Sequence, residues 1–209
     1  MATLLYIQAS PRIEHSHSIA VASAFVEAYR AGHGDDRIVE MNLFETDLPP
    51  FDLLAVNAKY NVMHSREQSD EQRAAWDRIV AEINRFKAAD KYVFAVPMWN
   101  FSIPWRLKQY IDILVQPGLT FTIEDGRYKG LLEDKSALIV YARGGQYPAG
   151  TDLNAFDHQK PYIETILPFI GITDVSAIVI EPTLQQGPDA AGQKQVAAIE
   201  KAKQLVGQF

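Results

Sequence analysis

The sequence has no cysteine, and this absence excludes several kinds of chemistry at once. Disulfide bonds, thiol nucleophiles, CxxC redox centres and thiolate metal sites all need that residue. Long apolar runs are missing as well, and no apolar run in the sequence is long enough to cross a bilayer. Residues 1–7 lack the basic region that precedes the apolar stretch of a secretory signal. We therefore expect a cytoplasmic protein that does not span a membrane.

Positive charge is also scarce. Acidic residues outnumber basic ones by 26 to 20, which gives a net charge of −6, and no cluster of lysine and arginine stands out. Binding to a phosphate backbone needs concentrated positive charge, and a polybasic membrane patch is equally absent. We expect neither nucleic acid nor a membrane surface among the partners.

Three well-known motifs are missing too. No GxGxxG is present, which argues against a dinucleotide pyrophosphate on the first loop, and no GxxxxGK[ST] is present, which excludes a P-loop NTPase. The five histidines show no HExxH or similar spacing, so we expect no metal site.

What the sequence does contain is a regular alternation of apolar strands and amphipathic helices. The strands read as continuous apolar runs, which is typical of a parallel sheet buried on both faces. We predict one α/β domain over residues 1–209, with a flavodoxin-like, doubly wound, five-stranded parallel sheet and helices on both faces. The predicted strands cover residues 3–8, 37–41, 91–96, 136–141 and 175–180, and the predicted helices cover 16–31, a segment starting at Ser69, 103–115, 153–170 and 190–205.

Several local signals refine these boundaries. Ser69 and Gln72 form a capping-box pattern at a helix start. Pro161 and Pro168 are expected to break or kink the helix over 153–170, and Gly171 to close it. The connection over 43–64 is long, and we expect it either to form a dimer face and pocket wall or to cover the core.

The loop after the first strand is rich in hydroxyl groups. Ser10, Ser16 and Ser18 lie just before or within the start of a helix, where unpaired backbone N–H groups hold phosphates. A single serine there would be interpreted as a helix cap. The three together favour binding of a terminal monophosphate, such as that of FMN.

The loop after the third strand is too apolar for a solvent loop. It contains Pro97, Met98, Trp99, Asn100 and Phe101. The aromatic residues could be ordinary core residues, but a buried amide between them must find hydrogen-bond partners. We predict a slot for a flat ring, with backbone N–H groups and Asn100 on its polar edge.

The loop after the fourth strand is predicted to form a third side of the same binding site, beside the loops after the first and third strands. It reads Ala142, Arg143, Gly144 and Gly145, followed by Tyr147. Paired glycines form turns, and they also let the backbone approach a ligand closely. Since ligands of such sheets bind beyond the carboxyl ends of the strands, the three loops are predicted to form one site.

These loops resemble those of the bacterial FMN-dependent NADH:quinone oxidoreductases and azoreductases. The most specific element is P-M-[YW]-N-F, seen at 97–101, followed by a helix with Leu107 and Lys108. Segments 118–121 and 169–172 match as well. Two residues depart from the family pattern, because Ala142 replaces a serine and Trp99 the commoner tyrosine.

The resemblance implies a homodimer with one FMN per subunit, reduced by NADH or NADPH and reoxidised by quinones or aromatic azo compounds in the same pocket. It implies no catalytic side chain, since the flavin carries the chemistry. Phe121, Tyr147 and Phe156 are candidates for contact with flat substrates. The alternatives are a flavodoxin-like electron carrier and an NADPH-dependent FMN or chromate reductase. The predicted cofactor-binding residues are Ser10, Ser16, His17, Ser18, Pro97, Met98, Trp99, Asn100, Phe101, Ala142, Arg143, Gly144 and Gly145.

Overall fold

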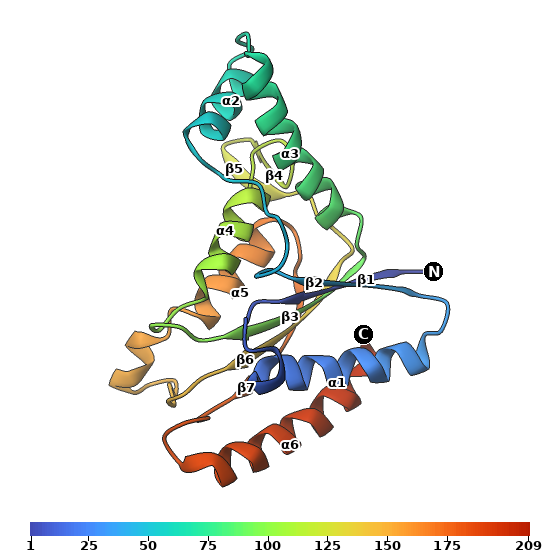
Figure 1. Cartoon of the computed structure of the whole chain (residues 1–209), viewed down its shortest axis with the longest axis vertical. Coiled ribbons are helices and arrows are strands. Elements are labelled where there is room, and N and C mark those ends of the chain that lie inside the picture. Colours follow the sequence, from blue (N-terminus) through green and yellow to red (C-terminus); the bar gives the residue numbers. More distant parts are fainter.

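Five parallel strands form the central sheet of the computed structural model, which describes all 209 residues. Their order is β2-β1-β3-β6-β7, so the chain winds outward in both directions from β1 and β3 (Figure 1). The predicted α/β doubly wound sheet is confirmed. The strands are β1 (Thr3–Gln8), β2 (Arg37–Asn42), β3 (Lys91–Pro97), β6 (Ser136–Ala142) and β7 (Asp174–Ile180).

Helices cover both faces of this sheet (Figure 1). Alternate residues of β1 face opposite sides: Leu4 and Tyr6 pack in one core, and Leu5 and Ile7 pack in the other. Because both faces of β1 are buried, its central positions are apolar without alternation. One face carries α1 (His17–Gly32) and α6 (Gly187–Leu205), and the other carries α3 (Asp70–Lys87), α4 (Trp105–Leu114) and α5 (Lys160–Phe169).

Most predicted helix starts are confirmed to within a few residues. The capping box at α3 is formed, with Gln72 N donating to Ser69 Oγ at 3.2 Å and Ser69 N donating to Gln72 Oε1 at 3.1 Å. Helix α4 begins at Trp105, with Pro104 as its N-cap residue. Helix α6 begins at Gly187, three residues before the predicted start at 190.

The predicted helix over 153–170 is wrong in its first half. A short 3-10 helix over Asp152–Phe156 is followed by a break, and α5 begins only at Lys160. The break precedes Pro161, because a proline in the first helical turn loses no hydrogen bond. Pro168 lies in the last turn, and Gly171, at a φ of +107°, ends the helix as predicted while Ile172 N donates to Leu167 O at 2.9 Å.

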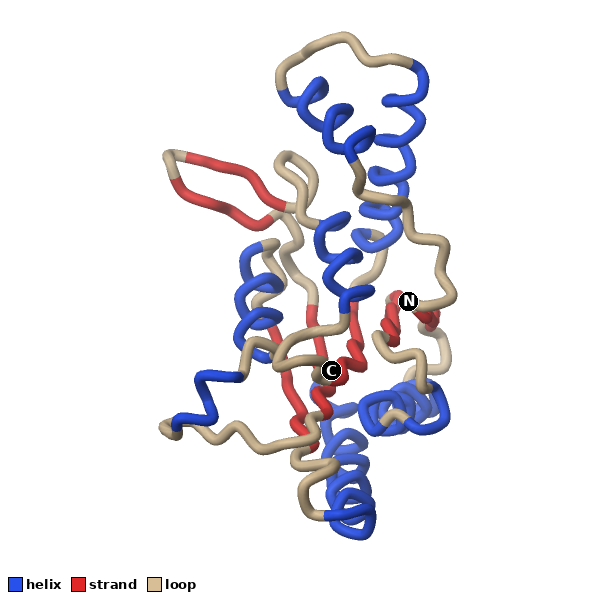
Figure 2. Tube along the Cα trace, turned by 60° about the vertical axis from the view of Figure 1, so that its left-hand side comes forward, coloured by secondary structure: helices blue, strands red, loops and turns tan.

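One helix and one two-stranded hairpin were not predicted. Helix α2 (Leu53–Met63) lies within the long connection and starts after Asp52, whose carboxylate accepts from the N–H groups of Leu54 and Ala55. With α3 it forms an arm that projects from the sheet (Figure 1). Strands β4 (Phe121–Glu124) and β5 (Arg127–Gly130) form an antiparallel hairpin apart from the main sheet (Figure 2).

The base of this hairpin lies directly against the end of α5. A Cβ atom added to Gly130 would lie 2.1 Å from Gly171 N and 2.4 Å from Ile170 C. Leu132 N donates to Ile170 O at 2.9 Å, and this hydrogen bond holds the base of the hairpin against the end of α5. Only glycine fits at this position, because the atoms that it meets belong to backbone.

Candidate functional site

The three predicted loops follow neighbouring strands, because β1 and β6 flank β3. Hydrogen bonds continue the sheet into the loops: Ala9 N donates to Ala95 O at 3.0 Å, and Met98 N donates to Ala142 O at 2.8 Å. The loops therefore start side by side at the carboxyl edge of the sheet, where such folds bind ligands.

The three serines of the first loop are all buried. Ser16 is the N-cap of α1, accepting from Ile19 N at 3.4 Å, and its hydroxyl lies 3.1 Å from that of Ser18. Ser10 Oγ accepts from Arg12 N at 3.3 Å. Ser16 and Ser18 share one hydrogen bond between two O–H groups, and the Ser10 O–H donates none within the chain. Free hydroxyl donors thus lie beside the unpaired N–H groups of a helix start, an arrangement suited to an anion.

The His17 side chain makes a contact outside this loop. Its ring Nδ1 lies 2.6 Å from Gln195 Oε1, which ties the side chain to α6. This ring nitrogen is therefore engaged away from the serine hydroxyls.

The second loop forms a tight turn. Trp99 N donates to Ser102 O at 2.9 Å and Ser102 N donates to Trp99 O at 3.0 Å, while the φ angles of Asn100 and Phe101 are +47° and +68°. Two successive positive φ values define a type I′ turn. Phe101 is 46% exposed, so it is no core residue. The backbone N–H groups of Asn100 and Phe101 donate no hydrogen bond within the chain.

The glycine pair of the third loop packs against the chain that follows β7. Gly144 O accepts from the N–H groups of Leu184 and Gln185, at 3.1 and 3.3 Å. A Cβ at Gly144 would lie 2.8 Å from Leu184 Cδ1, and one at Gly145 would lie 3.0 Å from the Gln185 amide nitrogen. The N–H groups of both glycines donate no bond within the chain. This wall, like the turn, offers free backbone donors.

The Arg143 side chain is directed elsewhere. Only 3% of the residue is exposed, and its guanidinium pairs with Asp157 and Glu181. Ala142 is also buried and offers its carbonyl to Met98. Whereas the sequence analysis treated Arg143 as a cofactor-binding residue, the structure engages its side chain in a buried ion-pair group.

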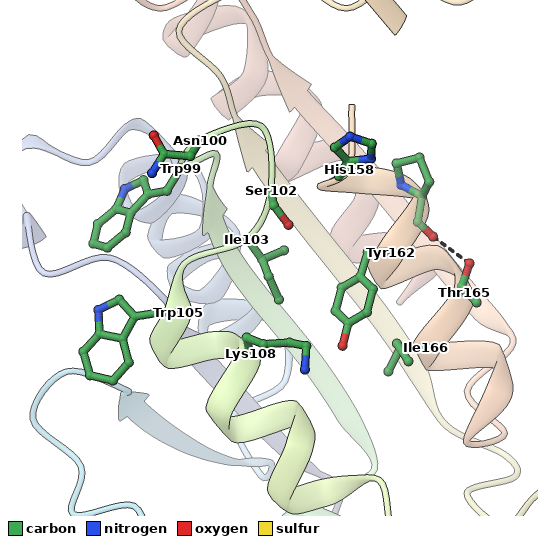
Figure 3. Close-up of a pocket in the computed structure, with 11 residues that line it drawn as sticks. Trp99, Asn100, Ser102, Ile103, Trp105, Lys108, His158, Tyr162, Thr165 and Ile166 are labelled. Atoms are coloured by element: carbon green, nitrogen blue, oxygen red, sulfur yellow. Dashed lines mark hydrogen bonds between the residues drawn. The ribbon is translucent and has the colours of Figure 1, made fainter. Parts of the chain in front are cut away.

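A cavity of about 750 Å³ opens beside the turn, between α4 and α5 (Figure 3). The sequence analysis missed its α5 side, because those residues belong to no motif. Burial raises the pKa of Tyr162 to about 12, so its phenol is neutral and able to donate a hydrogen bond near pH 7. The cavity is lined by Trp99, Asn100, Ser102, Ile103, Trp105, Lys108, His158, Pro161, Tyr162, Thr165 and Ile166.

Aromatic rings gather around the turn. The Phe101 ring lies 5.2 Å from that of Phe156 and 6.4 Å from that of Tyr147, between centroids. Phe156 and Tyr147, two of the three predicted substrate-contact residues, thus both lie beside Phe101.

The third, Phe121, packs instead on Phe169 and Tyr128, at the opposite end of α5. On the other side of the turn, Phe44 lies 5.7 Å from Trp99. Phe44 follows β2 and carried no signal in the sequence, since an aromatic residue after a strand is ordinary.

No helix combines the length and apolar character needed to cross a membrane. No group of three or more histidine, aspartate and glutamate side chains is arranged to hold a metal ion.

Comparison with known proteins supports the resemblance over the whole chain. The chain is 51% identical over 209 residues to an FMN-dependent NADH:quinone oxidoreductase of Nitratidesulfovibrio vulgaris strain DP4, covering all of both chains. A protein of the same name from Desulfotalea psychrophila is 40% identical, covering 98% of this chain and 95% of the relative.

Solved structures agree. An azoreductase from Bacillus anthracis strain Sterne superposes with a TM-score of 0.91 at 30% identity, covering 100% of both chains. An FMN-dependent NADH-azoreductase from Bacillus anthracis strain Ames Ancestor, solved in complex with FMN, gives a TM-score of 0.90 at 25% identity, covering 100% of this chain and 99% of the other. The family model described as flavodoxin-like fold matches residues 2–206. The chain therefore belongs to the flavodoxin-like family, among the FMN-dependent NADH:quinone oxidoreductases and azoreductases.

Proposed function

We propose that this protein is a cytoplasmic, single-domain enzyme that binds FMN and transfers two electrons from NADH to quinones and aromatic azo compounds. The donor and acceptor use one pocket in turn, so the oxidised nucleotide leaves before the acceptor enters. NADH is the donor named for the relatives, and NADPH remains a second donor to be compared with it.

One observation carries this proposal: three adjacent loops offer free donors for the two ends of a flavin mononucleotide. The hydroxyls of Ser10, Ser16 and Ser18 with the start of α1 suit a phosphate. The unbonded N–H groups of the turn and of Gly144 and Gly145 suit the polar edge of a flat ring. The absence of a side chain at both glycines lets the chain after β7 pack closely against this wall, because a Cβ there would lie 2.8 Å from Leu184 Cδ1 or 3.0 Å from the Gln185 amide nitrogen. The residues present therefore fit FMN.

The remaining parts of the site orient the reactants. FMN supplies the hydride chemistry when it is bound. Free N–H groups at Asn100, Phe101, Gly144 and Gly145 would stabilise negative charge on the ring without any rearrangement. Phe156 and Tyr147 beside Phe101 provide apolar surface for a flat acceptor. Protons for the acceptor can come from water, so no side chain is assigned as a general acid.

An anaerobic titration tests this function. Protein reconstituted with FMN is expected to lose its visible flavin absorbance on addition of one equivalent of NADH, and to regain it on addition of a quinone. With both substrates varied, double-reciprocal plots should be parallel, because the substrates alternate in one pocket. Bound flavin that NADH fails to reduce would indicate an electron carrier instead, and intersecting lines would contradict the alternating order.

We also propose that the enzyme is a homodimer. Trp105 is 61% exposed beside the open cavity between α4 and α5, and an apolar surface of this kind favours a protein partner. Sedimentation velocity is expected to give one species of about twice the chain mass of 23.4 kDa. A monomer with full activity would contradict the proposal.

A further inference from the structure

Arg143 is the centre of a buried polar group that the proposed chemistry does not use. Its Nε donates to Gln159 Oε1 at 2.9 Å, and its Nη2 forms a 2.7 Å ion pair with Asp157 Oδ2. Its Nη1 lies 3.3 Å from Glu181 Oε2. Burying a cation with its partners costs desolvation free energy that an apolar cluster of the same volume would avoid. Stability alone therefore gives little reason for this group.

The group is bonded to both ends of the second loop. Gln159 Nε2 donates to Val96 O at 2.9 Å, one residue before Pro97. His158 N donates to Phe101 O, also at 2.9 Å, at the tip of the turn. The short segment before α5 therefore holds the turn from its start to its tip.

The same arginine is part of the opposite wall through its backbone. Arg143 N donates to Ile180 O at 3.0 Å, and its carbonyl accepts from Thr183 N at 2.8 Å and from Thr183 Oγ at 3.0 Å. Gly144 and Gly145 follow directly. One residue thus belongs to the glycine wall by its main chain and holds the turn by its side chain.

We propose that Arg143 is a positioning residue, which acts with Gln159 to set the spacing between the Asn100–Phe101 turn and the Gly144–Gly145 wall. This inference rests on the proposed function, because it assigns that spacing to the flavin ring. The guanidinium makes its polar contacts with Asp157, Gln159 and Glu181, so it acts through them and not on the ring.

Gln159→Met is the sharpest test. The substitution conserves the length of the side chain, adds no charge, and removes the bonds to Arg143 and to Val96 together. The Kd values of FMN and of riboflavin are measured by quenching of flavin fluorescence on the apoprotein. Both Kd values are expected to rise by the same factor of about ten or more, since a bond that positions the ring concerns both ligands. The two-electron midpoint potential of bound FMN should also fall, because the ring-edge donors are displaced.

Two further variants complete the test. Arg143→Lys keeps the charge but not the fork of donors, and it is expected to change both Kd values in the same direction. Lys160→Met is the matched control: this neighbouring side chain pairs with Glu164 and makes no bond to either wall. It should leave both Kd values within about twofold. Circular dichroism verifies folding, and if Arg143→Lys fails to fold, Gln159→Met alone decides.

The outcomes separate this inference from the proposed function. Wild-type protein that binds no flavin would overturn the proposed function. Wild-type protein that binds FMN, together with folded Gln159→Met protein of unchanged Kd and potential, would overturn the positioning role alone. A loss of FMN affinity with unchanged riboflavin affinity would also overturn it, because that pattern belongs to the phosphate loop.

Discussion

Replacing Ser16 and Ser18 together by alanine is expected to raise the Kd of FMN by at least about 100-fold, since hydrogen bonds to a charged group contribute about 1.5–3 kcal/mol each. The hydroxyls lie 3.1 Å apart at the start of α1, so one phosphate can reach both. Riboflavin, which has no phosphate, should bind both proteins equally. Fluorescence quenching with the two ligands measures the difference.

Helix capping complicates this experiment, because Ser16 also caps α1 and its loss costs about 1 kcal/mol of stability. Ser69→Ala is the matched control. It removes the N-cap of α3, which lies outside the three loops, and should cost a similar free energy of unfolding while leaving the Kd of FMN unchanged. Equal FMN affinity in the double variant and the wild type would contradict phosphate binding at this loop.

Gly130→Ala is expected to reduce the free energy of unfolding by roughly 3–5 kcal/mol, at the upper end for a single substitution. The new Cβ would lie 2.1 Å from Gly171 N. Backbone cannot move aside as a side chain can, so the hairpin and the end of α5 must separate. Urea denaturation measures the loss.

Gly126→Ala provides the comparison within the same hairpin. Gly126 lies at the tip with a φ of +74°, and a Cβ there would meet no atom within 4 Å. The substitution should cost only the left-handed backbone penalty of about 1–2 kcal/mol. Equal losses of unfolding free energy in the two variants would contradict this prediction, because they would show that the backbone around Gly130 moves aside to admit a Cβ.

The sheet could be predicted from sequence because its signals are local. The central strands β1, β3 and β6 are apolar runs buried on both faces, and the capping box at Ser69 is complete within four residues. The hairpin and α2 gave no such signal. Both project from the sheet, and their sequences lack the long apolar stripe of a covering helix or the run of a central strand.

The candidate site was predictable in outline and not in detail. The rule that ligands bind beyond the carboxyl ends of neighbouring strands selects the three loops. It does not give the direction of a side chain. His17 bonds to Gln195, and Arg143 pairs with Asp157. These partners are distant in sequence, and only the packing of the folded chain brings them together. The side of the cavity formed by α5 was missed because its residues belong to no motif.

The turn between Trp99 and Ser102 closes on itself with two hydrogen bonds, whereas the serine-rich loop after β1 also contains the N-cap of α1, a core helix. The two central side chains of the turn can therefore change without altering a strand or a helix. Substitutions there leave the sheet and the helices unchanged, whereas replacement of Ser16 also removes the N-cap of α1. Directed evolution of acceptor preference should therefore begin at the side chains of Asn100 and Phe101 and leave the serines unchanged.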